Sequence, residues 1–172
     1  MSPTPGPASW KAWWVSKADD IPAAVSLFVS NIDANYISHG EVMEGRAIDF
    51  NTWSSDIRKR IHDEFESVLR TETGANEIQK LACLKVNNSL CGVSLLALNL
   101  ETMTAVLEDI VVDKSVRGQQ LGKLFLEWIE SEMKSIGMKR LFLESGIRNE
   151  GAHHFFERAG FRTTSIVMAK EL

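Results

Sequence analysis

The chain has 172 residues and a formal net charge of −4, with 44% hydrophobic and 24% charged residues. This length and composition are ordinary for one globular domain, large enough to bury roughly two-thirds of its unfolded surface. The mild negative charge argues against a nucleic-acid-binding protein, which normally presents a basic face.

The cysteine content and the lack of long apolar runs predict a cytoplasmic protein without disulfide bonds. Cys83 and Cys91 are too few for a disulfide framework, and we expect both to be buried free thiols. We find no apolar run near the ~20 residues of a spanning helix and no signal peptide, which predicts no membrane association and a cytoplasmic location. Residues 1–9 are rich in proline and predict a disordered tail, with a single domain over 10–172.

The first half predicts one strand and two helices. Trp10–Ser16 is typical of a strand, and Asp20 followed by Ile21-Pro22 opens a helix, since Asp can cap and proline is tolerated in the first turn. Asn35–Phe50 has no clear period and contains two glycines, so we expect a loop or a broken helix. Ser55–Arg70 places apolar residues on one stripe and predicts the second helix.

The second half predicts mainly strands, with two helices between them. The sequence turns at Asn87-Asn88 and again at Glu101-Thr102, and this pattern is typical of consecutive antiparallel strands. The expected elements are the strands Leu81–Val86, Leu90–Leu98 and Met103–Val112, the helix Gln119–Ile136, the strand Lys139–Glu144, the helix Asn149–Ala159 and the strand Phe161–Lys170. The order β-α-α-β-β-β-α-β-α-β predicts an α/β fold with a sheet of mixed direction.

A glycine-containing loop lies between the Met103–Val112 strand and the helix that follows. Arg117, Gly118 and Gly122 fall where unpaired backbone N–H groups and the helix dipole favour an anion. Glycine allows close approach of a phosphate, and Arg117 can add a charge-assisted contact. A pyrophosphate would suit this site; alternatively, these residues only shape a turn. The Gly-Lys-Ser/Thr ending of a Walker loop is not present.

This loop resembles that of the GNAT acetyltransferases, Arg/Gln-x-x-Gly-x-Gly/Ala. Here it reads Arg117-Gly-Gln-Gln-Leu-Gly122, with Gln120 in place of the usual glycine, and it is similar in particular to glucosamine-6-phosphate acetyltransferases. The segment Arg148–Phe161 resembles the C-terminal motif of other GNAT amine acetyltransferases, with Phe156 where tyrosine is usual. The resemblance covers Leu90 to Leu172. It implies a mixed, mostly antiparallel sheet flanked by helices and splayed at its central strands to admit acetyl-CoA.

The resemblance assigns acetyl-CoA as co-substrate and names the positions that would contact it. Three strand residues would lie along the pantetheine arm, loop N–H groups would hold the pyrophosphate, and two residues of the C-terminal motif would lie beside the cofactor. These positions are Ile110, Val111 and Val112; Arg117, Gly118, Gln119, Gln120, Leu121, Gly122 and Lys123; and Asn149 and Phe156. For Phe156, packing in the core is the alternative.

Amide formation needs a neutral amine, so a base is expected near the thioester, because a lysine-like amine has a pKa of about 10.4. Glu108 matches the family's base position, and Asp109 is its neighbour. Adjacent strand residues point to opposite faces, so only one is expected to face the substrate. Both could instead be solvated carboxylates at a strand end.

The resemblance places the acceptor pocket near Tyr36, His39 and Glu41, which could contact a polar or cationic small-molecule amine. No metal-binding constellation is found. The interpretation is direct acetyl transfer to a primary amine. A non-catalytic acyl-CoA-binding regulator and a protein or peptide acetyltransferase remain the alternatives, and a homodimer is left open.

Overall fold

The computed structural model describes residues 9–70 and 74–172, which divide into two compact units. The first unit comprises the described residues up to Ile32 and those of Asp56–Glu144, and the second comprises Asp33–Ser55 and Ser145–Leu172. The tail expected at 1–9 lies almost wholly outside the described residues. A single domain over 10–172 stays a prediction.

The first unit contains the main sheet and three α-helices. The predicted strands and helices of this part are confirmed to within a few residues, apart from an earlier start of the second strand at Glu77. The elements are β1 (Trp10–Trp14), η1 (Ala18–Asp20), α1 (Ile21–Asn31), α3 (Ile57–Ser67), η3 (Val68–Arg70), β4 (Glu77–Val86), β5 (Ser89–Asn99), β6 (Thr104–Val112), η4 (Lys114–Val116), α4 (Leu121–Ser135) and β7 (Arg140–Leu143).

The sheet has the strand order β1-β4-β5-β6-β7. Neighbouring strands are antiparallel except β6 and β7, which are parallel, so the sheet is mixed and mostly antiparallel as predicted. The β4–β5 hairpin turns at Asn87 and Asn88, both with positive φ. Asparagine tolerates this conformation better than most residues, which explains why the pair marks the turn.

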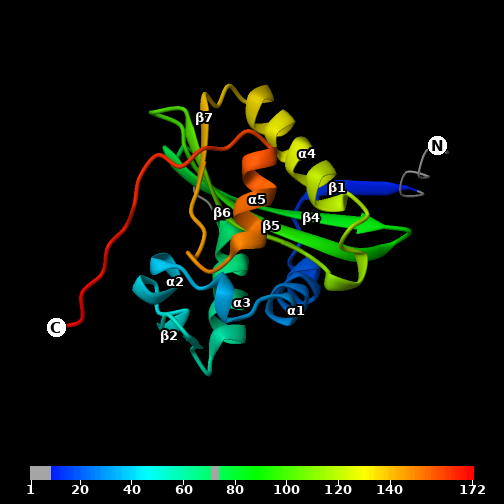
Figure 1. Cartoon of the computed structure of the whole chain (residues 1–172). Helices are drawn as coiled ribbons and strands as arrows, with labels where there is room; N and C mark the ends of the chain where they lie inside the picture. Colours follow the sequence, from blue (N-terminus) through cyan, green and yellow to red (C-terminus); the bar gives the residue numbers. More distant parts are fainter. Residues whose placement is uncertain (1–8, 71–73) are drawn as a thin grey trace, which may run out of the picture. The chain divides into compact units, whose positions relative to one another are not determined.

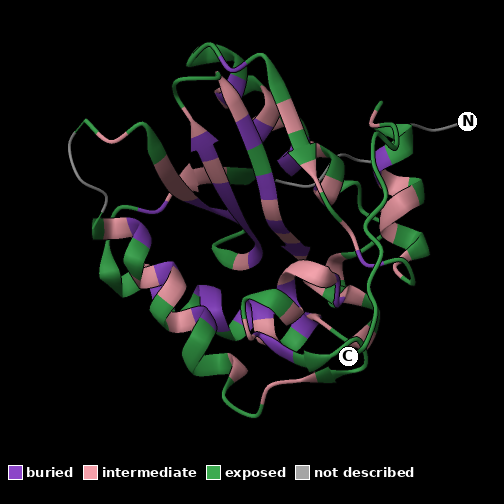
Figure 2. Cartoon of the chain, turned by 90° about the vertical axis from the view of Figure 1, so that its left-hand side faces the viewer, coloured by how far each residue is buried: buried purple, intermediate pink, exposed green. Residues whose placement is uncertain are grey.

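Helices cover both faces of this sheet (Figure 1). On one face Phe28 of α1 and Phe65 of α3 pack edge to face, with ring centroids 5.9 Å apart. On the other face α4 packs through Trp128 against Trp14 of β1, whose indole donates to Glu132 at 2.7 Å. Figure 2 shows that the buried residues run along the central strands, where both sides of the sheet are covered.

The second unit contains short elements that sequence periodicity does not reveal. The range predicted as a loop or broken helix contains η2 (Ala34–Tyr36), α2 (His39–Met43) and a small hairpin of β2 (Ala47–Asp49) and β3 (Thr52–Trp53), while α5 (Glu150–Arg158) is as predicted. Strands of two or three residues are too short to show alternation, so the hairpin could not be recognised.

The predicted final strand, Phe161–Lys170, is wrong. Residues 161–172 contain no helix or strand, and the strand order of the main sheet ends at β7. Side chains in this segment are highly exposed, including Ile166 at 84% and Met168 at 90%. Threonine, isoleucine and valine favour extended backbone, but a strand also needs a hydrogen-bonded neighbour, which composition does not supply.

Both cysteines are buried free thiols, as predicted. Burial raises the pKa of Cys83 to about 12, and burial likewise raises the pKa of Cys91. A thiol in such surroundings stays protonated and unreactive near neutral pH. Within residues 9–70 and 74–172, the structure contains no helix that is long and apolar enough to cross a membrane.

Candidate functional site

A β-bulge in β6 falls at Glu108. Leu96 of β5 pairs with Leu107, and the next residue, Leu95, pairs with Asp109, so Glu108 is an extra residue between two paired positions. A bulge bends its strand and redirects a side chain, and bulges are frequent beside active sites. The strict alternation expected for Glu108 and Asp109 therefore does not apply here.

The same position is where β6 and β7 separate. Their parallel register runs from Thr104↔Arg140 to Leu107↔Leu143, where β7 ends, whereas β6 continues to Val112. Over Glu108–Val112 the edge of β6 that faces away from β5 therefore has no strand beside it among the described residues. Backbone groups along such an edge can bind an extended ligand by strand-like hydrogen bonds. Ile110, Val111 and Val112, the residues predicted to line the cofactor arm, lie on this stretch.

The predicted phosphate loop connects β6 to α4. Gly118 has φ +82°, and Gln120, which immediately precedes the helix, has φ +61°. A Cβ at Gly118 would meet no atom within 4 Å, so the loop surface is open at that position. The helix begins at Leu121, and the first N–H groups of a helix have no acceptor inside it. The loop can therefore present Gln119, Gln120, Leu121, Gly122 and Lys123 to an anion such as a pyrophosphate.

Asn31, at the end of α1, holds the start of this loop. Its side chain accepts a hydrogen bond from the Lys114 N–H at 2.8 Å and donates to the Leu27 carbonyl at 2.8 Å. Asp113 accepts bonds from the N–H and hydroxyl of Ser115, which hold the pKa of its carboxyl below its usual range. Arg117 folds back, its Nε donating to the Val112 carbonyl at 3.3 Å.

The two predicted catalytic carboxylates differ in their surroundings. Glu108 is half-buried, and its Oε2 accepts a hydrogen bond of 3.0 Å from the side-chain amide of Gln79 on β4. Asp109 is only 1% exposed, and its backbone carbonyl accepts a bond of 2.7 Å from the Ser94 hydroxyl. Glu108 lines an open groove, described below, and is the better placed of the two to meet a substrate.

The predicted acceptor-pocket residues lie together in the second unit. Tyr36 packs against Trp53, with ring centroids 6.2 Å apart, and His39 begins α2. Glu41 is only 7% exposed and closes a capping box, accepting bonds of 2.6 Å from the N–H and the hydroxyl of Ser38. These contacts give Glu41 a structural role, while substrate contact by the three residues stays a prediction.

The C-terminal motif contributes a rigid loop and an aromatic cluster to the second unit. Arg148 donates to Asn51 Oδ1 at 2.8 Å, to the Ala34 carbonyl at 2.9 Å and to the Phe50 carbonyl. It therefore joins the loop before α5 to the 34–51 segment. Phe156 is 8% exposed and packs against the neighbouring rings of Phe155 and Phe161, with centroids 5.1 and 5.6 Å away.

Asn149 lies at the N-terminal end of α5, where its backbone carbonyl accepts from Ala152 and His153. Contact of Asn149 and Phe156 with a cofactor stays a prediction. In the described part of the chain, no group of three or more His, Cys, Asp or Glu is arranged to hold a metal ion.

Two contacts of the site were not expected from sequence. Gln79 precedes Glu108 by 29 positions, and Asn31 precedes Lys114 by 83. Neither residue belongs to a motif, and each is far from its partner in the sequence and close to it only in the folded chain. An amide residue inside an otherwise apolar strand or helix is a weak signal for such contacts, because burial of a polar group requires a partner.

The chain also matches known proteins. It is 38% identical over 64 residues to glucosamine 6-phosphate N-acetyltransferase of Arabidopsis thaliana, covering 37% of this chain and 41% of that protein. It is 30% identical over 66 residues to aminoalkylphosphonate N-acetyltransferase of Salmonella typhimurium, covering 38% and 43%. The alignments thus span less than half the length of these curated relatives.

The similarity of fold extends further. The crystal structure of glucosamine-6-phosphate N-acetyltransferase from Arabidopsis thaliana superposes with a TM-score of 0.61 at 18% identity, covering 95% of this chain and 98% of that one. The model of the acetyltransferase (GNAT) family matches residues 47–161, well over half of the chain. With its bulged strand, its separating β6 and β7 and its glycine loop, the chain belongs to the acetyltransferase (GNAT) family.

Proposed function

We propose that this protein is an N-acetyltransferase that transfers the acetyl group of acetyl-CoA directly to a primary amine. The observation that carries the proposal is the position of Glu108 in a chain of this family. Its carboxylate is placed at the bulge, where the ladder between β6 and β7 has just ended, and four residues before β6 itself ends ahead of the glycine loop.

The residues that would hold acetyl-CoA fit the parts of that molecule. The edge of β6 over Ile110–Val112 suits the amide groups of the pantetheine arm, and the N–H groups of Arg117–Lys123 suit the pyrophosphate. Bound in this way, acetyl-CoA supplies a thioester carbonyl that a neutral amine can attack. The new C–N bond replaces the C–S bond, and CoA leaves as its thiolate.

Glu108 would take the proton that the amine loses, directly or through water. The hydrogen bond from Gln79 to Oε2 keeps the Glu108 side chain oriented, and this side chain lines the groove. Asp109 is nearly fully buried, which supports Glu108 rather than Asp109 in this role.

The experiment that tests the proposal measures release of the CoA thiol with amino sugars, polyamines, aminoglycosides, amino acids and peptides. We expect turnover with at least one amine, and a fall in kcat of roughly 10²-fold or more in Glu108→Gln with unchanged acetyl-CoA affinity. Activity of that variant should partly recover at high pH, as the amine loses its own proton. Glu101→Gln removes an equal charge in the exposed β5–β6 turn and should leave kcat unchanged.

The competing functions give different results in the same assay. Acetyl-CoA binding without turnover across the panel would support a non-catalytic regulator, and turnover confined to peptides would support a protein acetyltransferase. Full activity of Glu108→Gln at neutral pH would remove Glu108 from the mechanism and transfer the role to Asp109 or water.

A further inference from the structure

An open groove of about 760 Å³ lies against β4, β5 and β6, entirely within the first unit. Its lining includes Glu77 and Gln79 of β4, Ala97 and Asn99 of β5, and Val106 and Glu108 of β6. The register places these residues in successive rows: Glu77 pairs with Asn99, and Gln79 pairs with Ala97, which pairs with Val106. They therefore share one face of the sheet, and this face ends at Glu108.

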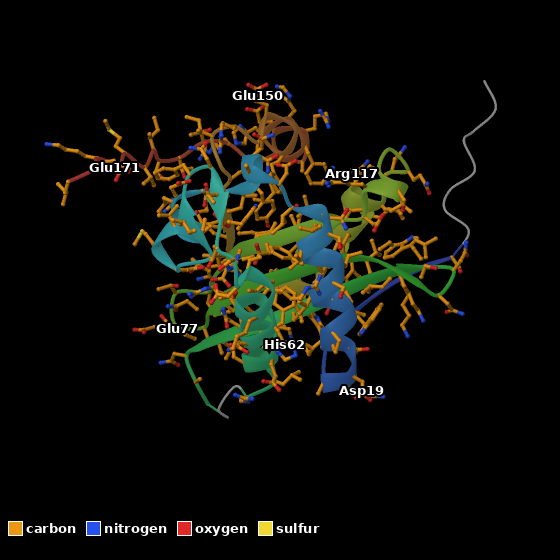
Figure 3. All side chains as sticks on the ribbon, turned by 90° about the horizontal axis from the view of Figure 1, so that it is seen from below. Asp19, His62, Glu77, Arg117, Glu150 and Glu171 are labelled. Carbon is orange, nitrogen blue, oxygen red and sulfur yellow. The ribbon has the colours of Figure 1, made fainter. Side chains whose placement is uncertain are left out.

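The groove approaches Glu108 from the opposite direction to the glycine loop. β4 and β6 run in the same direction, so Glu77 marks the starting end of both strands, whereas Arg117 follows the far end of β6. Figure 3 shows Glu77 and Arg117 at opposite ends of the sheet. A molecule in the groove and a molecule bound along Ile110–Val112 would thus meet at the bulge, where the Glu108 carboxylate lies.

The charge of the groove is negative. Of the described residues that line it, two are carboxylates, Glu77 and Glu108, and none is basic. Each carboxylate is oriented by a neutral amide: Asn99 donates to Glu77 at 3.4 Å and Gln79 donates to Glu108 at 3.0 Å. A concave surface with charges of one sign concentrates ligands of the opposite sign. The groove therefore suits a cation.

The two carboxylates are separated by an apolar floor. Counting four rows along the strands and two strands across gives about 16 Å between the Glu77 and Glu108 backbones, at ~3.3 Å per residue and ~4.8 Å per strand. Ala97 and Val106 lie between them, and Val106 is exposed. Since both glutamate side chains can lean inward, a short aliphatic chain with a charged nitrogen at each end spans this arrangement.

We propose that the groove is the acceptor site and that it selects linear diamines or polyamines. Glu108 receives the reacting nitrogen, Glu77 binds the distal ammonium, and Ala97 and Val106 contact the methylene chain. This inference rests on the proposed acetyl transfer for the role of Glu108, but the binding of the amine itself does not depend on turnover.

The proposal separates this chain from the two relatives named above. Both are named for amines that also carry a phosphorus-based acid group, and such a group is normally held by arginine, lysine or backbone N–H groups. Arg140 pairs with Thr104 across β6 and β7 but is not among the residues that line the groove. Two carboxylates would repel a phosphate placed between them.

The kinetic test compares 1,4-diaminobutane with butylamine, which has the same chain and lacks the second nitrogen, and with glucosamine 6-phosphate. We expect kcat/KM for the diamine to exceed that for each of the others by at least tenfold. Glu77→Gln should raise KM for the diamine about tenfold with little change in kcat, and it should leave butylamine turnover unchanged. Glu101→Gln, which removes an equal charge in the β5–β6 turn, should change neither.

A binding test keeps this proposal separate from the proposed function. Titration of the full chain with 1,4-diaminobutane in the absence of acetyl-CoA should give a Kd that weakens about tenfold in Glu77→Gln and weakens with added salt. If other amines are acetylated but the diamine shows no preference, or Glu77→Gln changes nothing, the groove assignment fails and the enzyme remains. If no amine is acetylated, the proposed function fails. The binding titration then tests the groove assignment by itself: the assignment stands if diamine binding depends on Glu77 and fails if it does not. Preference for glucosamine 6-phosphate would overturn the assignment outright.

Discussion

Gly146 is a position where the structure predicts a large effect of a single methyl group. A Cβ added there would lie 2.4 Å from the Ile37 carbonyl oxygen and 2.8 Å from that of Asn35, whereas real Cβ atoms essentially never approach below 3.0 Å. Both obstacles are backbone, so no change of rotamer relieves the contact. Gly146 has no positive φ, and alanine could adopt its backbone conformation. The expected effect of Gly146→Ala therefore comes from overlap alone.

The magnitude follows from the cost of overpacking, which is about 1–3 kcal/mol. We expect the upper half of this range, because the Arg148 side chain holds the Ala34 and Phe50 carbonyls and so opposes any shift of the segment. At about 2–4 °C for each kcal/mol in a chain of this size, the Tm should fall by roughly 4–12 °C.

Thermal and urea unfolding of Gly146→Ala should be measured beside Gly151→Ala. Gly151 lies in the first turn of α5 and has no atom within 4 Å of its Cβ position, so its replacement should leave the Tm unchanged or raise it slightly, since alanine favours helix. An unchanged Tm in Gly146→Ala would show that the 145–149 loop does not lie against the 35–37 segment in solution.

Three further changes test the cofactor site and the core. Gly122→Glu should weaken the binding of acetyl-CoA, measured by calorimetry, so that the Kd rises at least tenfold. A negative charge in the first turn of α4 interacts favourably with the helix dipole, so we expect the variant to stay folded, and retained stability would exclude a folding defect. Cys83 and Cys91 should react with a thiol reagent only after denaturation, and rapid labelling of the native protein would contradict their burial. Burial raises the pKa of Cys83 to about 12, from an unfolded value near 8.5. The contribution of the buried Cys83 thiol to stability should therefore be complete below pH ~8.5 and lost as the pH rises towards 12. Phe156→Tyr should raise kcat severalfold if its added hydroxyl protonates the leaving thiolate, whereas joint loss of stability and cofactor binding would show that the ring belongs to the dry cluster with Phe155 and Phe161.

Local chemistry explains which parts of the fold could be predicted from the sequence. Asn87-Asn88 specifies a tight turn by its backbone preferences, and the apolar stripe of α4 specifies an amphipathic helix, so both were confirmed. The segment 161–170 shows the limit of this reasoning. Its residues favour extended backbone, but pairing requires a neighbouring strand, and no local pattern indicates whether one is present.

The candidate site divides in the same way. The glycine loop was recognisable because a positive φ at Gly118 and a helix start after Gln120 are local properties of a few residues. The bulge was not recognisable from the sequence, because a residue is extra only relative to the pairing of its partner strand. The position of Asp109 relative to Glu108 depends on the pairing of Leu95 and Leu96, which lie 12 or more positions earlier in the chain.

The bulge lies where the two halves of the proposed chemistry meet. An extra residue bends and twists its strand locally, and the pairing of β6 with β7 ends at Leu107, immediately before it. The irregularity is therefore placed to separate the strand edge from β7. Glu108 lies two residues after Val106, so alternation places both side chains on the groove face, and the residue whose position the bulge changes is Asp109, which pairs with Leu95. A regular β6 would keep the carboxylate in the groove but could continue its ladder with β7. It would then offer no strand edge for an extended ligand beside that carboxylate.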